Sequence, residues 1–425
     1  MRIDNSKICP ILSAKIMSQS LEELPVIVQL TNENLELEKG IKSLSTKVKT
    51  SLPLINGIAC NLTTDTIYRL ANSPDIEYIS FDSKVFTQLD IASSSIKANY
   101  PHNLGYSGKG VTVAVVDTGV APHQDLTRPN NRIVGFKDFI NDKTSPYDDN
   151  GHGTHVAGII AGNGYSSRGK YIGMAPEANI LAIKALDNVG SGSTSSIISA
   201  ISYVISTKDT YGTKVINLSV GSPANNSCRN DPLCRAVVEA MNRGIVVVAA
   251  AGNSGPNNGT ILSPGINPNV ITVGASNDNR TIDISDDTIA SFSSRGPTIE
   301  GVSKPDLVAP GVNINSLSNV KLDGYRSSSG TSMATPFISG TVALMLEKNK
   351  NLSPREVKRK LMDSCVSLKD NRESQGAGLI DLEKLFYVEN REKRDEIVKK
   401  KPPRKDEDMF EMILVLLLVM ILLDR

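Results

Sequence analysis

The chain has 425 residues, of which 40% are hydrophobic and 21% are charged, as is ordinary for a globular protein. A net charge of +1, 4% aromatic residues and the lack of tryptophan argue against a nucleic-acid-binding protein, which needs a basic surface or rings for base stacking. The length allows one large domain and a smaller one.

The N-terminal segment and the cysteines indicate where the protein acts. Lys7, Pro10 and Lys15 interrupt every apolar run of signal-peptide length, so no signal peptide is predicted. The five cysteines are odd in number and scattered, which fits reduced thiols better than a disulfide framework. Only Cys228 and Cys234 lie close enough in sequence to suggest a local bridge or site. We therefore expect a cytoplasmic protein.

Residues 25–82 are predicted to form a small α+β unit. Apolar strands are expected at 25–30, 54–62 and 76–81, with helical stretches at 33–48 and after Thr63. The serine-rich, polar residues 83–110 are then predicted to be a linker.

From Val111 onward, strands and helices alternate. Near-continuous apolar strands that alternate with helices are typical of a parallel sheet covered by helices on both faces. The fold class predicted is therefore α/β, with a doubly wound, mostly parallel sheet, and ligands should bind at the carboxyl ends of its strands. Strands are expected at 111–117, 179–185, 214–220, 244–251 and 269–275, and helices at 153–162, 194–206, 232–243, after Ser332 and at 354–363.

The C-terminal part changes composition twice. Residues 387–408 are predicted to be a charged, solvated linker, and residues 409–425 an apolar tail. Its twelve consecutive apolar residues, 412–423, would make a helix of about 18 Å, short for a hydrocarbon core of about 30 Å. Association with a membrane surface, docking onto protein and a degenerate end all stay open, and the lysines upstream suit an anionic inner leaflet.

Ser332 stands at a conspicuous junction. It lies between small residues in the stretch Gly330–Pro336, where a polar loop at 323–329 gives way to an apolar helix. The first N–H groups of a helix lack partners and favour negative charge, so the serine could be a nucleophile. An ordinary helix N-cap is the alternative, and this stretch alone does not decide between them.

Three other strand–loop junctions carry residues capable of chemistry. Asp117 follows the strand from Val111 and could orient a base or cap a loop. His152 lies between glycines at a helix start and is one of four histidines that could act as a base. A metal site with His155 is disfavoured, because the spacing is three and the glutamate of His-Glu-x-x-His is missing. Asn253 could donate to an oxyanion or could simply belong to a turn.

Together, these four residues supply an orienting carboxylate, a base, an oxyanion donor and a nucleophile, as acyl transfer requires. The stretches Val113–Gly119, Gly151–Gly158, Ala250–Gly255 and Gly330–Pro336 resemble the motifs of the subtilisin-like serine protease family (peptidase S8). The resemblance is greatest to the intracellular, AprX-like branch. It implies a serine endopeptidase acting on proteins or peptides, in which Asp117, His152 and Ser332 form the triad and Asn253 forms the oxyanion hole.

The resemblance also implies a substrate site. Two segments would bracket the substrate backbone, and small residues would wall a pocket for a broad range of apolar side chains. These residues are Gly190, Ser191 and Gly192, then Ser219, Val220 and Gly221, and finally Ala250, Ala251 and Gly252. Members of the family often bind calcium, and Asp125 matches one ligand position. The loop at 162–172 differs from the usual calcium loop and carries two cations, so no cofactor is predicted and calcium stays an open alternative.

The resemblance divides the chain into a propeptide-like module at 1–85 and a peptidase domain at 86–386. The module would inhibit the enzyme as its own propeptide until it is cut between Lys84 and Gln88, and a permanently attached accessory domain is the alternative. The function predicted is thus a self-processed, self-inhibited serine endopeptidase. A catalytically silent pseudo-protease that binds or regulates, and a membrane-associated interaction protein, are the other hypotheses.

Overall fold

The computed structural model describes residues 5–9, 12–13, 15–16, 23–82 and 91–387. The chain divides between Phe81 and Asp82 into two compact units. The predicted cleavage region between Lys84 and Gln88, the charged linker at 388–408 and the apolar tail at 409–425 lie outside the described residues.

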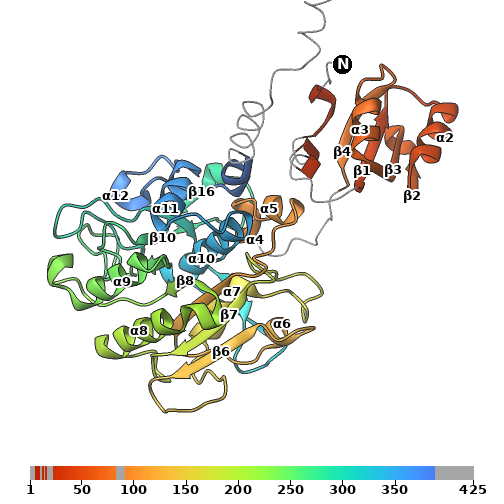
Figure 1. Cartoon of the computed structure of the whole chain (residues 1–425). Coiled ribbons are helices and arrows are strands. Elements are labelled where there is room, and N and C mark those ends of the chain that lie inside the picture. The colour runs from red at the N-terminus through yellow and green to blue at the C-terminus, as the bar shows by residue number, and fades with distance from the viewer. Residues whose placement is uncertain (1–4, 10–11, 14, 17–22, 83–90, 388–425) are drawn as a thin grey trace, which may run out of the picture. The chain divides into compact units, whose positions relative to one another are not determined.

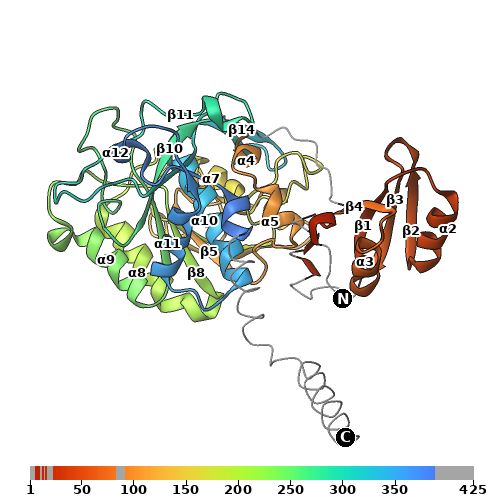
Figure 2. The same cartoon turned by 90° about the horizontal axis from the view of Figure 1, so that it is seen from above.

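The N-terminal unit is a four-stranded antiparallel sheet in the order β2-β3-β1-β4, packed against two helices (Figures 1 and 2). Alternate side chains of its central strand β1 are buried, and the helices close the core with Ile41 and Ile67. Its elements are β1 (Glu23–Leu30), α2 (Leu35–Leu44), β2 (Lys47–Leu52), β3 (Gly57–Thr63), α3 (Thr64–Ala71) and β4 (Ile76–Phe81), with the short turns η1 (Asn5–Lys7) and η2 (Pro53–Ile55).

Strand β2 was missed from the sequence. The predicted helix at 33–48 ends at Leu44, and the chain pairs with β3 from Lys47 onward. As an edge strand, β2 leaves most of its side chains exposed, so its sequence lacks the apolar alternation by which a half-buried strand is recognised.

The second unit is built on a ten-stranded sheet in the order β15-β16-β12-β10-β9-β8-β5-β7-β6, with β11 paired to β10. Every pairing is parallel except those of β11 and β15, so the predicted doubly wound α/β class is correct. The strands are β5 (Thr112–Asp117), β6 (Ile133–Asp138), β7 (Asn179–Lys184), β8 (Thr213–Leu218), β9 (Val246–Ala250), β10 (Ile271–Asn277), β11 (Thr288–Ile289), β12 (Leu307–Pro310), β15 (Cys365–Val366) and β16 (Leu379–Ile380).

Helices cover both faces of this sheet. On one face, α8 (Thr194–Tyr211) and α9 (Pro232–Asn242) lie side by side and pack on Ala114, Leu181 and Ile216 of the central strands (Figure 1). On the other face, α7 (His152–Ala161) packs against α10 (Thr331–Lys348), which is buried along most of its length. Because both α7 and α10 start at the carboxyl edge of the sheet, their first residues meet there.

Smaller elements complete the unit, and several of them were not predicted. They are α4 (Ile91–Ser95), α5 (Asn99–Asn103), α6 (Gln124–Thr127), α11 (Pro354–Asp363), α12 (Arg372–Gln375), the turns η3 (Cys228–Asn230) and η4 (Ile284–Asp286), and the hairpin of β13 (Ile314–Leu317) and β14 (Tyr325–Ser328). Residues 91–110 are therefore not the linker predicted from their serine content, since Ile96 and Tyr100 are buried. Strand β14 occupies the predicted polar loop at 323–329, where one tyrosine followed by Arg-Ser-Ser gives no alternation of apolar and polar residues.

Candidate active site

Asp117 and His152 are joined by a short hydrogen bond. Asp117 ends β5 and is fully buried, and its Oδ1 lies 2.7 Å from Nδ1 of His152, the first residue of α7. The backbone N–H of Thr118 donates to the same oxygen over 2.7 Å. A carboxylate can only accept, so the proton of this bond is on Nδ1, and in the neutral imidazole Nε2 therefore keeps its lone pair.

Charges around His152 favour its protonated form. Burial lowers the pKa of the imidazole, but the charge and hydrogen bond of Asp117 and the charge of Asp148 raise it by more, so the net shift is upward. The guanidinium of Arg326 acts in the opposite direction.

Two glycines let α7 approach the end of β5. A Cβ atom on Gly153 would lie 2.1 Å from the carbonyl oxygen of Gly119 and 3.0 Å from Cβ of Asp117. Gly119 has a φ of 109°, and a Cβ atom there would lie 2.1 Å from the carbonyl oxygen of Tyr147. The short bond between Asp117 and His152 therefore depends on bare backbone at both positions.

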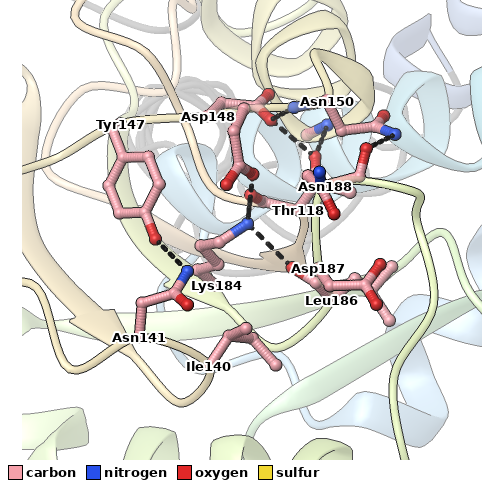
Figure 3. A network of polar contacts seen from close by, with 12 residues as sticks. Thr118, Ile140, Asn141, Tyr147, Asp148, Asn150, Lys184, Leu186, Asp187 and Asn188 are labelled. Carbon is pink, nitrogen blue, oxygen red and sulfur yellow. Dashed lines mark hydrogen bonds and ion pairs between the residues drawn. The ribbon is translucent and has the colours of Figure 1, made fainter.

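Asp148 organises the loop that enters α7, as Figure 3 shows in part. One of its carboxylate oxygens accepts from the Thr118 hydroxyl at 2.9 Å and from the N–H groups of Asn150 and Gly151. The other accepts from the N–H of Thr154 at 2.9 Å and from its hydroxyl at 2.6 Å. The carboxylate thus connects the end of β5 to the first turn of α7, a role that the sequence analysis missed.

A buried lysine, Lys184, also bonds to this loop. Lys184, at the end of β7, is fully buried, and its Nζ donates to the carbonyl oxygens of Thr118 at 2.8 Å and Leu186 at 2.9 Å (Figure 3). It also forms a 2.5 Å ion pair with Asp149. An ammonium bonded to three acceptors fixes the backbone beside Asp117.

Ser332 is the second residue of α10 and is held from β8. Its hydroxyl donates to the carbonyl oxygen of Ser219 at 3.0 Å, and the Ser219 hydroxyl donates back to the Ser332 carbonyl at 2.9 Å. Asn217 donates to that Ser219 hydroxyl, and Ser339 of α10 donates to Asn217. Ser332 and His152 line one cavity, but the serine hydroxyl bonds to the Ser219 carbonyl, so a rotation about its Cα–Cβ bond is needed before it can reach the imidazole.

Asn253 is oriented by Thr331. The amide oxygen of Asn253 accepts from the Thr331 N–H at 2.9 Å and from the Thr331 hydroxyl at 3.0 Å. The same hydroxyl accepts from the N–H of Gly252 at 3.2 Å. With its oxygen held in this way, the side chain offers its NH₂ group to the cavity beside Ser332. Asn253 was predicted from the sequence to lie here, whereas Thr331 was not.

The cavity has a volume of about 560 Å³ and is lined by His152, Asn253 and Ser332, whereas Asp117 is buried behind His152. Every residue predicted to bind substrate lines it except Ala251, which is buried against Cys234, Ile261 and Ile266. Of the predicted pocket wall at 250–252, only Ala250 and Gly252 lie on the cavity, because the Ala251 side chain packs into that apolar cluster instead. Five large apolar residues of the wall were not predicted from the sequence, namely Leu186, Val189, Ile197, Leu233 and Leu262.

The residues around Asp125 do not fit a calcium ion. One oxygen of this buried carboxylate accepts from the N–H of Ser166 at 2.8 Å, and the other accepts from the Tyr325 hydroxyl at 2.7 Å. The guanidinium of Arg132 donates to the carbonyl oxygens of Asp125, Ala161 and Ala178. The oxygen atoms that calcium would need as ligands therefore already bond to the Arg132 guanidinium, the Ser166 N–H and the Tyr325 hydroxyl. Across the described part of the chain, no group of three or more His, Cys, Asp or Glu side chains could hold a metal ion.

Comparisons with known proteins agree with this geometry. The family model described as "Subtilase family" matches residues 108–379. The serine protease AprX of Bacillus subtilis (strain 168) is 43% identical over 376 residues, which are 84% of this chain and 83% of that protein. Subtilisin E of the same strain is 36% identical over 345 residues, or 79% of this chain and 82% of that protein.

Two solved structures are also similar to this chain. The structure titled "Sphericase" has a TM-score of 0.56 and 32% identity, and the match covers 71% of this chain and 95% of that one. A cold adapted subtilisin-like serine proteinase has a TM-score of 0.52 and 34% identity, over 64% of this chain and 88% of that one.

Proposed function

The chain belongs to the subtilase family and is a subtilisin-like serine endopeptidase, and we propose that Ser332, His152 and Asp117 are its catalytic triad. The observation that supports this assignment best is the 2.7 Å bond from the buried Asp117 to His152, which lines the same cavity as Ser332. Substrates are proteins or peptides.

In the first half of the reaction, the Ser332 oxygen attacks the carbonyl carbon of the scissile bond. Its proton passes to Nε2 of His152, and Asp117 stabilises the imidazolium that forms. The NH₂ group of Asn253 and the backbone N–H of Ser332 donate to the oxyanion. His152 then gives the proton to the leaving amine, and a water molecule, activated by the same imidazole, hydrolyses the acyl-enzyme.

The residues before the scissile bond bind in the cavity. Gly190–Gly192 and Ser219–Gly221 lie on its walls and can pair with an extended peptide as neighbouring strands. The cavity lining holds neither an acidic side chain nor a lysine or arginine, and Leu233 and Leu262 extend its apolar surface. We expect apolar side chains to be accepted broadly at the residue before the cleaved bond.

Covalent labelling tests the assignment. A peptidyl phosphonate or a sulfonyl fluoride should label wild-type protein on Ser332, and the label should be lost in the Ser332→Ala variant together with peptide hydrolysis. A pseudo-protease, the alternative, would take up no label at Ser332. Hydrolysis that persists in Ser332→Ala would reject Ser332 as the nucleophile.

The N-terminal unit acts as an inhibitory propeptide in this proposal. The separation of the chain between Phe81 and Asp82 supports a removable module. Purified wild-type protein should lose about its first 85 residues, whereas Ser332→Ala should keep its full length. If both proteins are processed alike, self-cleavage is rejected and a permanently attached accessory domain is favoured.

The protein is proposed to act in the cytoplasm, with its C-terminal tail attached to the inner face of the membrane. All five cysteines are free thiols, which suits a reducing compartment. Of the helices in the described ranges, none combines the length and apolarity that crossing a membrane requires. Membrane fractionation of the full chain and of a variant lacking residues 409–425 tests the attachment, and equal partitioning of both would reject it.

A further inference from the structure

The hairpin of β13 and β14 lies directly against the loop that precedes His152. A Cβ atom on Gly151 would lie 2.3 Å from the amide oxygen of Asn319 and 2.7 Å from a terminal nitrogen of Arg326. Asn319 also donates to the carbonyl oxygen of Asp148 at 3.1 Å. The Arg326 guanidinium therefore touches the backbone of the residue next to the proposed base.

The hairpin is anchored, so this position is fixed by the fold. The Nε2 atom of the buried His155 lies 3.0 Å from the carbonyl oxygen of Ile314 and 3.2 Å from that of Arg326. The Ser316 hydroxyl donates to the carbonyl oxygen of His155 at 2.7 Å. Both strands of the hairpin are thus bonded to the second turn of α7.

Arg326 is a charged group without a charged partner. Its side chain is exposed on β14, and no carboxylate within the described ranges forms an ion pair with it. Its charge reaches the catalytic centre, because it lowers the pKa of both His152 and His155. An exposed cation beside a catalytic histidine can attract an anion of the substrate.

The hairpin lies outside the cavity that contains Ser332 and His152. The cavity lining includes Gly190, Ser219 and Gly252, and no residue of the hairpin contributes to it. When the residues before the scissile bond fill this cavity, the leaving half of the peptide passes His152, which must reach its amine. Gly151 directly precedes His152 and is covered by the Arg326 guanidinium, so this exposed cation is a charge that the leaving half can meet next to His152.

We propose that Arg326 is a specificity-determining residue that favours substrates with a carboxylate side chain shortly after the scissile bond. This inference rests on the proposed roles of Ser332 and His152. An extended peptide advances by about 3.3 Å per residue, so the first three residues of the leaving half are the ones that the guanidinium can reach.

Matched peptides test the proposal. Internally quenched peptides with one common acyl half would carry Glu or Gln at the first, second or third residue after the cleaved bond. For wild-type enzyme at low ionic strength, we expect kcat/KM to be about two- to fivefold higher with Glu than with Gln at one of these positions, the effect of one exposed ion pair. The ratio of kcat/KM with Glu to kcat/KM with Gln should approach one in 1 M salt, which screens exposed charges.

Three variants make the test specific. Arg326→Gln should bring the ratio of the two kcat/KM values to about one, and Arg326→Lys should keep part of the preference. Lys321→Gln is the control, because it removes an exposed cation near the tip of the same hairpin, where Lys321 lies 3.8 Å from Asp323. This control should keep the wild-type ratio.

Failure of this inference differs from failure of the proposed function. The role of Arg326 is wrong if wild-type enzyme shows no Glu preference at any of the three positions. It is also wrong if Arg326→Gln keeps the wild-type preference, or if Lys321→Gln loses it. If Arg326→Gln does not fold, the ratio in Arg326→Lys and its dependence on salt still decide. Persistent hydrolysis by Ser332→Ala would instead overturn the proposed function.

Discussion

The oxyanion hole can be tested through Thr331, which holds Asn253 but does not touch the substrate's reacting bond. In Thr331→Val, the hydroxyl that donates to the Asn253 amide oxygen at 3.0 Å is replaced by a methyl group of similar size, while the Thr331 N–H still donates to that oxygen at 2.9 Å. Asn253 therefore loses one of two restraints. The NH₂ group should then point at the oxyanion for a smaller fraction of the time.

The size of the effect follows from the lost bond. One neutral hydrogen bond contributes about 0.5–1.5 kcal/mol, which corresponds to a decrease in kcat of about two- to twelvefold. The upper limit is loss of the whole donor, about 2.7–4 kcal/mol, a value measured on a relative in the same family. Because the oxyanion forms only during the reaction, kcat should change more than KM.

A double-mutant cycle separates this role from a purely structural one. If Thr331 acts through Asn253, then Thr331→Val should lower kcat by less than about twofold in an Asn253→Ala background. Multiplicative effects of the two substitutions on kcat would refute the reasoning. The free energy of unfolding should fall by about 1–3 kcal/mol, because the buried N–H of Gly252 loses its acceptor.

Thr335→Val is the matched control. Thr335 is also buried in α10, but its hydroxyl donates to the carbonyl oxygen of Thr331 one turn earlier and not to Asn253. Thr335→Val removes a buried hydroxyl from the same helix without removing a bond to Asn253. Its kcat should therefore stay at the wild-type level whatever the change in stability.

The remaining predictions concern the triad and the region around Asp125. Asp117→Asn should lower kcat/KM by roughly 10⁴-fold at pH 8, because the amide no longer holds the imidazole in the tautomer that leaves Nε2 free to accept a proton. Because the pKa of His152 is raised and only the neutral imidazole can act as a base, the acidic limb of kcat/KM against pH should lie above the ordinary histidine value of about 6.5. Arg326→Gln removes a charge that lowers this pKa, so the limb should move further up, and a downward shift would contradict the assignment. Addition of EDTA should leave the thermal midpoint of the peptidase unit unchanged, whereas Arg132→Met should lower the free energy of unfolding by about 3–5 kcal/mol, because three carbonyl groups lose a buried charged donor. A midpoint that falls in EDTA would show that calcium stabilises the fold.

Asp117, His152, Asn253 and Ser332 could be found from the sequence because each follows a local pattern. Each stands where an apolar strand ends or a helix begins, and parallel strands bring such positions to one edge of the sheet. Ala251 follows β9, which ends at Ala250, and its burial against Cys234 and Ile266 depends on packing between elements that no local pattern reports.

The contacts that position these residues depend on segments far apart in the chain. Thr331 bonds to Asn253 across 78 residues, and Arg326 approaches Gly151 from a hairpin whose polar residues carry no strand signal. Periodicity and propensity describe only local backbone geometry, so the sequence alone determined the class of the fold and the chemical groups at its carboxyl edge. The tertiary structure alone decided the donors to Asn253, the buried support of Asp148 and Lys184, and the cation beside His152, because these arise from packing between distant elements.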